Sequence, residues 1–177
     1  MVFTVLAGAL IGMGIGAISA WAQVPSFMVT LGALVSVRGI TYLISQGSPL
    51  GGFPSSFNFI GSAQIGDVTL MGFIFLGVTV LACVLLRFTV LGEYVYATGG
   101  NFLAAGLSGV PTRAIITFVF SVSGAVAAFG GVILTSRLRI AQPTAAQSLE
   151  LDAIAAVVLG GTSFFGDAAG SPAPSSR

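Results

Sequence analysis

The sequence contains no histidine and no lysine, so its six basic residues are all arginine. It has a single cysteine, Cys83. Without an imidazole or a second thiol, the chain has no Cys/His zinc site and no intramolecular disulfide. Without lysine it has neither a P-loop for nucleotide phosphates nor an amine for Schiff-base chemistry. These absences exclude several common classes of enzyme, and we expect no catalytic residue, metal or cofactor in this chain.

Charge is scarce as well, since only 6% of the residues are charged, against about 25% in an average soluble domain. Hydrophobic residues make up 55% of the chain and the mean hydropathy is +1.05. Such a chain has too few polar side chains to cover a water-soluble globule, and it is too apolar to be disordered. A net charge of +1 from scattered arginines also offers no basic patch for nucleic acid. The composition therefore predicts a membrane protein with several spans.

Four apolar runs are long enough to cross a hydrocarbon core of about 30 Å, which requires about 20 helical residues. They comprise residues 2–22, 27–44, 68–86 and 114–136. A fifth run, 151–159, would cover only about 14 Å as a helix, or half a bilayer. We therefore predict an all-α polytopic transmembrane bundle with about four spanning helices and one half-helix or re-entrant segment.

The connections between these runs indicate a topology but do not fix it. Residues 45–67 contain no arginine, which favours the outside of the membrane. Residues 89–112 lie between Arg87 and Arg113, which favours the cytoplasm. Arg137 and Arg139 flank the opposite face, so the basic residues are balanced and charge alone leaves the orientation open.

Small residues recur at every fourth position in the first run, which on a helix forms a smooth stripe for close packing of another backbone. The fourth run carries a comparable set. We therefore expect these residues to form helix-packing faces. The first stripe consists of Gly8, Gly12, Gly16 and Ala20, and the second of Gly124, Ala127, Ala128 and Gly131.

Polar side chains within or beside the apolar runs are candidates for a translocation path. Arg38 lies inside its run, where burial in the membrane costs roughly 2.5–3.5 kcal/mol. It either faces a water-filled path or an acidic partner, or extends to the headgroups from a tilted helix. Glu150 and Asp152 precede the half-helix, where their charge favours the helix dipole or lines a polar path, with Ser148 a plausible N-cap. Thr30 is a weaker candidate for the same path.

The connection 92–109 has the pattern of a short capped helix. Gly99 and Gly100 break the chain, Asn101 is a good N-cap, and Gly109 is a natural stop at the other end. The pattern predicts a helix of about two turns that either docks on a partner or lies on the bilayer surface. Its small face comprises Ala104, Ala105 and Ser108.

These motifs resemble a known family. Ala104-Ala105-x-x-x-Gly109 resembles the Glu-Ala-Ala-x-x-x-Gly coupling loop of ABC importer permeases. Further blocks are similar to the ribose-type sugar permeases, and the most specific is Glu-Leu-Asp-Ala-Ile-Ala-Ala-Val-Val-Leu-Gly-Gly-Thr-Ser at 150–163. The other blocks lie at 24–32, 38–39, 96–101, 107–109 and 141–144. The similarity runs in order from about residue 8 to residue 166.

The resemblance implies a multi-pass subunit of the bacterial inner membrane that translocates a ribose-, xylose- or galactose-like monosaccharide. Implied partners are an ATP-binding subunit that hydrolyses ATP, a second permease subunit in a homo- or heterodimer, a periplasmic sugar-binding protein and membrane lipid. Residues 88–113 would then face the cytoplasm and dock on the ATP-binding subunit. The coupling residues implied are Gly92, Tyr96, Gly99, Gly100, Asn101, Ala104, Ala105, Ser108 and Gly109.

The sequence also departs from the family pattern. Phe102 and Leu103 stand where acidic residues are common, and Gly106 where a basic residue is common, so the docking edge is apolar here. We expect residues 1–166 to form a partial permease domain and 167–177 a disordered tail, and we hypothesise a truncated or frameshifted reading frame. A branched-chain amino-acid permease and a non-transporting membrane fragment stay open as alternatives.

Overall fold

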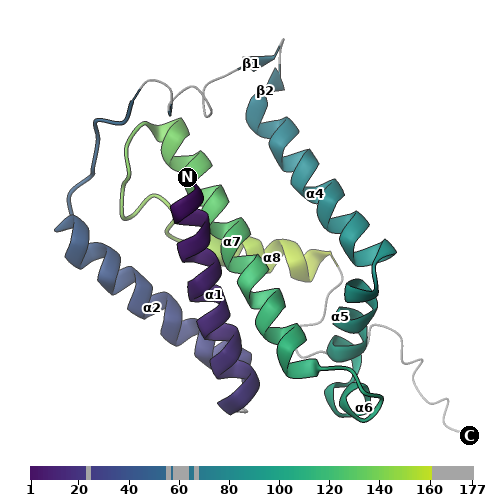
Figure 1. Ribbon diagram of the computed structural model, residues 1–177. Coiled ribbons are helices and arrows are strands. Elements are labelled where there is room, and N and C mark those ends of the chain that lie inside the picture. The colour runs from purple at the N-terminus through teal and green to yellow at the C-terminus, as the bar shows by residue number, and fades with distance from the viewer. Residues whose placement is uncertain (23–24, 55–56, 58–63, 66–67, 161–177) are drawn as a thin grey trace, which may run out of the picture.

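The computed structural model describes residues 1–22, 25–54, 57, 64–65 and 68–160. Within these residues the chain is almost entirely helical (Figure 1). Four helices are long and apolar enough to cross a membrane. These are α1 (Val2–Ala22), α2 (Ser26–Ser45), α4 (Leu70–Phe88) and α7 (Thr112–Leu138). The predicted all-α polytopic bundle is therefore confirmed.

The helix boundaries differ from the expected runs in one informative place. The third run was expected to begin at residue 68, but Val68–Thr69 forms strand β2, which pairs antiparallel with β1 (Gln64–Ile65). Helix α2 ends where Gln46 and Gly47 both take positive φ values, of 51° and 72°. Such left-handed backbone stops a helix and redirects the chain, and glycine adopts it without steric cost.

Helices α5 (Val90–Gly100) and α6 (Phe102–Leu107) follow α4 directly. They lie at the end of the molecule opposite β1 and β2 (Figure 1). The sequence analysis predicted only one short helix in this connection, and the structure has two, so the prediction missed α5. Gly99 and Gly100 form the last residues of α5 and do not interrupt an irregular loop. The chain leaves the helical conformation at the next residue, Asn101, whose backbone is extended with φ −154°.

The close contact between α1 and α7 forms the centre of the bundle. A Cβ atom on Gly8 would collide with Ala128, one on Gly12 with the carbonyl of Phe120, and one on Gly124 with the carbonyl of Gly8. A Cβ atom on Gly16 would lie 2.8 Å from the Cβ of Phe120. The two backbones can therefore approach only because glycine stands on both sides of the contact.

A side-chain hydrogen bond also crosses this interface. Ala20 is buried near the end of α1, and the Ser121 hydroxyl of α7 donates a hydrogen bond of 3.1 Å to the carbonyl of Ala9. Gly131 does not belong to the contact, because no other residue lies within 4 Å of the Cβ position it would have. Ala127 lines a groove beside α2, so Gly124 and Ala128 are the members of the expected second stripe that lie in the contact.

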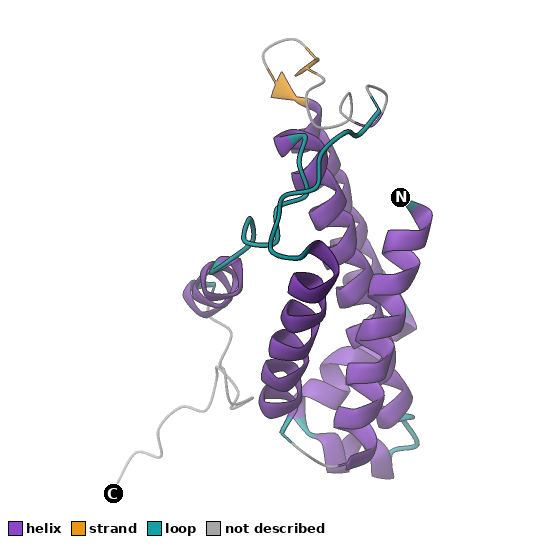
Figure 2. Cartoon of the chain, turned by 90° about the vertical axis from the view of Figure 1, so that its left-hand side faces the viewer, coloured by secondary structure: helices purple, strands orange, loops and turns teal. Residues whose placement is uncertain are grey.

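Helix α8 (Leu149–Leu159) has 11 residues, about 16 Å, as expected of a half-helix. It lies across the spanning helices, so it does not run alongside them (Figures 1 and 2). Ser148 does not cap it with its side chain, contrary to the expectation, because its backbone is left-handed with φ 74°. The Ser148 carbonyl instead accepts hydrogen bonds from the N–H groups of Leu151 and Asp152.

The α1–α7 contact predicts that alanine substitutions at two nearby glycines of α1 change the free energy of unfolding by very different amounts. Gly12→Ala would place a methyl group against the backbone of α7 and lower the free energy of unfolding by about 1–3 kcal/mol. Gly14→Ala is the matched control, because no other residue lies within 4 Å of that position. Thermal unfolding of the purified protein in detergent measures both. Equal midpoints for the two variants would contradict the packing described here.

Candidate functional site

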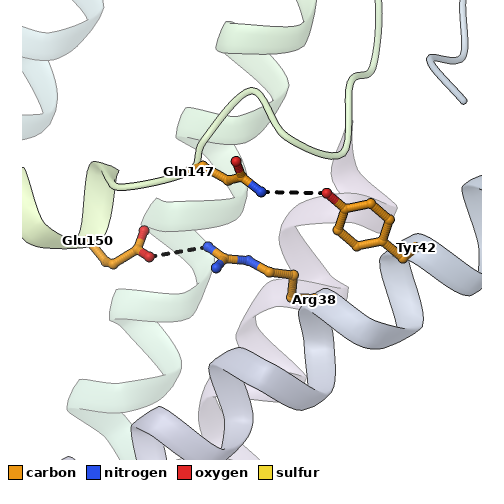
Figure 3. Close-up of polar contacts among 4 residues, drawn as sticks. All are labelled: Arg38, Tyr42, Gln147 and Glu150. Carbon is orange, nitrogen blue, oxygen red and sulfur yellow. Dashed lines mark hydrogen bonds and ion pairs between the residues drawn. The ribbon is translucent and has the colours of Figure 1, made fainter. Parts of the chain in front are cut away.

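An ion pair joins the middle of α2 to the start of α8. The Nη2 atom of Arg38 lies 3.2 Å from the Oε1 atom of Glu150, and the two side chains are 37% and 35% exposed (Figure 3). The two residues are 112 positions apart in the chain. Arg38 thus has an acidic partner inside the bundle, which offsets the cost of placing its charge among apolar helices.

A second polar contact lies one helical turn further along α2. The amide Nε2 of Gln147 donates to the phenolic oxygen of Tyr42 at 3.5 Å (Figure 3). Sequence reasoning missed both residues. Tyr42 is four positions after Arg38 and therefore on the same face of α2, which was a readable signal. Gln147 could be found only once the segment before α8 was known to cross α2.

A groove of about 530 Å³ lies beside these contacts, between α2 and α7. Helix α1 and the segment before α8 complete its walls. Its lining residues are Ile15, Thr30, Ala33, Leu34, Val37, Arg38, Thr41, Ala127, Pro143, Ala146 and Gln147. Within this list Arg38 is the single ionisable side chain. The remaining polar groups are hydroxyls and an amide, so the groove combines apolar walls with a few hydrogen-bonding groups.

A smaller groove of about 350 Å³ continues from the first and shares Thr41, Pro143 and Ala146 with it. Its far end is closed by a two-way backbone bridge, in which Leu50 and Ala141 exchange N–H···O bonds of 2.9 and 2.8 Å. The two grooves together follow the face between α2 and α7. No ionisable side chain is among the residues that line the smaller groove.

The remaining path candidates fall in different places. Thr30 lines the larger groove, and its hydroxyl donates to the carbonyl of Phe27 at 2.9 Å. Asp152 is exposed on α8 and lines neither groove. The structure therefore brings Thr30, Arg38 and Glu150 to one region and leaves Asp152 outside it. Helical spacing explains the split, since residues two apart on a helix point in different directions.

The connection between α4 and α7 ends in a tightly capped α6. The side-chain Oδ1 of Asn101 accepts a bond from the N–H of Ala104 at 2.9 Å, and Gly109 stops the segment with φ 86°. The Ser108 hydroxyl donates to the carbonyl of Ala104 at 2.9 Å. Of the expected small face, Ala105 is buried, whereas Ala104 and Ser108 are exposed. These contacts fix α6 as a short, rigid projection.

Apolar side chains cover the exposed side of this projection. Leu107 is 92% exposed and Leu103 75%, one helical turn apart. Tyr96 on α5 is also exposed. The role of Leu107 was missed, although its four-residue spacing from Leu103 could have indicated a shared face. Large apolar groups at the exposed tip of a structure mark a surface that contacts lipid or another protein.

Backbone geometry requires glycine at some positions of this segment and not at others. A Cβ atom on Gly92 would collide with the carbonyl of Leu86, so glycine allows α5 to fold back against the end of α4. The structure leaves open space around the Cβ positions of Gly99 and Gly100. Only Gly92 and Gly109 are therefore required by backbone geometry, the first for a close approach and the second for its positive φ.

Four apolar spanning helices, with a largely apolar groove that holds a few polar groups and a capped projection at one end, define a polytopic membrane protein of the transport type. A family model described as "Branched-chain amino acid transport system / permease component" matches residues 1–173. The chain belongs to this family of permeases. Together with the four apolar helices, this membership indicates a multi-pass protein of the inner membrane.

Individual relatives are named for other solutes. The chain is 44% identical over 165 residues to the ribose import permease protein of Haemophilus influenzae, and 42% identical over 167 residues to that of Escherichia coli. It is 37% identical over 166 residues to the D-allose transport system permease protein of Escherichia coli. These matches cover 91%, 90% and 91% of this chain, and each covers 51% of the relative. The chain thus spans about half the length of these relatives. No solved structure matches it.

The cap of α6 predicts a local change in dynamics. Asn101→Ala removes the acceptor for the Ala104 N–H and costs the helix about 1 kcal/mol, which is roughly a fivefold faster amide exchange in the first turn of α6. Asn101→Asp retains the acceptor and serves as the control. Hydrogen–deuterium exchange of residues 102–107 measures both variants. Unchanged exchange in Asn101→Ala would show that the side chain does not hold the helix.

Proposed function

We propose that this chain forms part of the membrane-spanning permease subunit of an ATP-driven ABC importer for a monosaccharide. The observation that carries the proposal is the identity of 42–44%, over about nine tenths of the chain, with permeases named for ribose import. The relative named for D-allose adds a second sugar to the same group. Catalysis in this proposal belongs to a separate ATP-binding subunit.

The proposed solute path follows the groove between α2 and α7. Support comes from the position of Thr30, Arg38 and Gln147 in the lining of the groove, in a chain where only 6% of the residues are charged. Polar groups inside membrane segments are expensive and commonly mark substrate pathways. Glu150 belongs to the path through its contact with Arg38. Asp152 is left out of the proposal because it lines neither groove.

The proposed contact with the ATP-binding subunit is formed by α5 and α6. These helices lie at the opposite end from β1 and β2, as a cytoplasmic segment would if the latter faced outside (Figure 1). The fixed cap at Asn101 and the exposed Leu103 and Leu107 suit a rigid apolar projection that inserts into a groove of the partner. A second permease subunit and a periplasmic sugar-binding protein complete the proposed assembly.

The alternative solute is a branched-chain amino acid, which the description of the matching family favours. Uptake into proteoliposomes distinguishes the two. The intact permease that contains this chain, reconstituted with the ATP-binding and solute-binding proteins encoded beside it, should accumulate labelled ribose when ATP is supplied. Accumulation of leucine without ribose would establish the alternative. A complex that moves neither solute would contradict both assignments.

The docking surface predicts a specific loss of binding. Leu107→Glu places a charge on an exposed side chain at the tip of α6, and it should reduce co-purification with the ATP-binding subunit at least about tenfold. Leu107→Met keeps the apolar contact and is the matched control. Pull-down of the tagged permease in detergent measures how much of the ATP-binding subunit each variant recovers. Equal recovery of the partner with both variants would remove α6 from the interface.

A further inference from the structure

The charges near the α2–α7 groove consist of one cation and one anion. Arg38 lines the groove and Glu150 pairs with it at 3.2 Å. The other charged residues of this part of the chain lie elsewhere, since Asp152 and Arg139 line neither groove and Arg137 lines the separate gap between α4 and α7. The electrical potential inside the groove therefore depends on whether Glu150 compensates Arg38.

We propose that Glu150 is a specificity-determining residue that keeps this groove electrically neutral, so that it admits uncharged, hydroxyl-rich solutes and disfavours anions. The inference rests on the proposed function, because it assigns the groove to the transported solute. It goes beyond that function by naming the residue that sets the charge preference.

The neutral state suits a polyol for two physical reasons. The hydroxyls of Thr30 and Thr41 donate their protons to backbone carbonyls of α2, so they offer their oxygens to a solute as acceptors. The side-chain amide of Gln147 can both donate and accept hydrogen bonds, as sugar hydroxyls can. The groove volume of about 530 Å³ lies within the range of small-molecule sites. A small uncharged solute is thus matched in size and in hydrogen bonding.

Loss of the Glu150 charge would reverse the preference. An unpaired Arg38 would leave one uncompensated positive charge in the wall of the groove. An anionic solute would then be attracted and a cationic one repelled. Replacing Arg38 as well would remove the field again, although the contact between α2 and α8 would still be broken. The double variant therefore separates the effect of charge from the effect of structure.

The first experiment measures the charge of the groove directly. Cys83, which is exposed, is replaced by Ser, and Ala33, which lines the groove, by Cys as a reporter. In membranes that hold the intact permease, the reporter reacts with anionic and with cationic methanethiosulfonate reagents. The ratio of the anionic to the cationic rate should rise about fivefold or more in Glu150→Gln, as expected for one uncompensated charge nearby.

The control variants decide what such a rise means. Asp152→Asn removes the same charge two residues away and should leave the ratio within about twofold of the parent. The double variant Arg38→Gln/Glu150→Gln should return to the parent ratio. A ratio that does not change in Glu150→Gln, or that changes equally in Asp152→Asn, would overturn the neutralising role.

The second experiment measures the solute preference. The intact transporter in vesicles takes up ribose in competition with ribonate, the carboxylate of the same sugar. Glu150→Gln should lower the ribose-to-ribonate ratio about fivefold, and the double variant should restore it. A double variant that stays as low as Glu150→Gln would show a structural role and overturn the proposal. A parent transporter that ignores ribose would instead refute the proposed function, and the reagent ratio would still decide the charge of the groove.

Discussion

The approach of two helix backbones across glycine is the constraint on which the rest of this bundle depends. Gly8 and Gly12 of α1 and Gly124 of α7 leave no room for a Cβ atom. Between apolar helices in lipid there is no hydrophobic driving force, so association must come from close van der Waals contact. The α1–α7 pair supplies this contact, and the two chain segments on either side of α7 start from it.

Those two segments carry the functional features. Before α7, the capped helix α6 projects from the end that holds Pro111 and Arg113, and after α7 the chain turns at Arg139, with φ 58°, towards α2. The polar contacts of Arg38 and Tyr42 then hold the start of α8 (Figure 3). Helix α8 packs little against the spanning helices, so these side-chain contacts determine much of its position.

The two regions suit different tasks because their chemistry differs. The projection exposes leucine side chains, which gain free energy when a partner covers them. The groove holds hydroxyls, an amide and a compensated charge, which can exchange hydrogen bonds with a passing solute without a large change in energy. Under the proposed function, the first surface suits a lasting contact with a partner subunit and the second a transient contact with a solute.

The number of spanning helices, the short α8 and the cap at Asn101 could be predicted from the sequence, because each depends on local properties. In hydrocarbon a backbone must satisfy its hydrogen bonds within its own helix, so an apolar run of sufficient length predicts a span. The contact of Arg38 with Glu150 and the burial of Ala105 emerged only in the folded chain. The ion pair joins residues 112 positions apart across the left-handed turn at Ser148, so it leaves no local signal in the sequence.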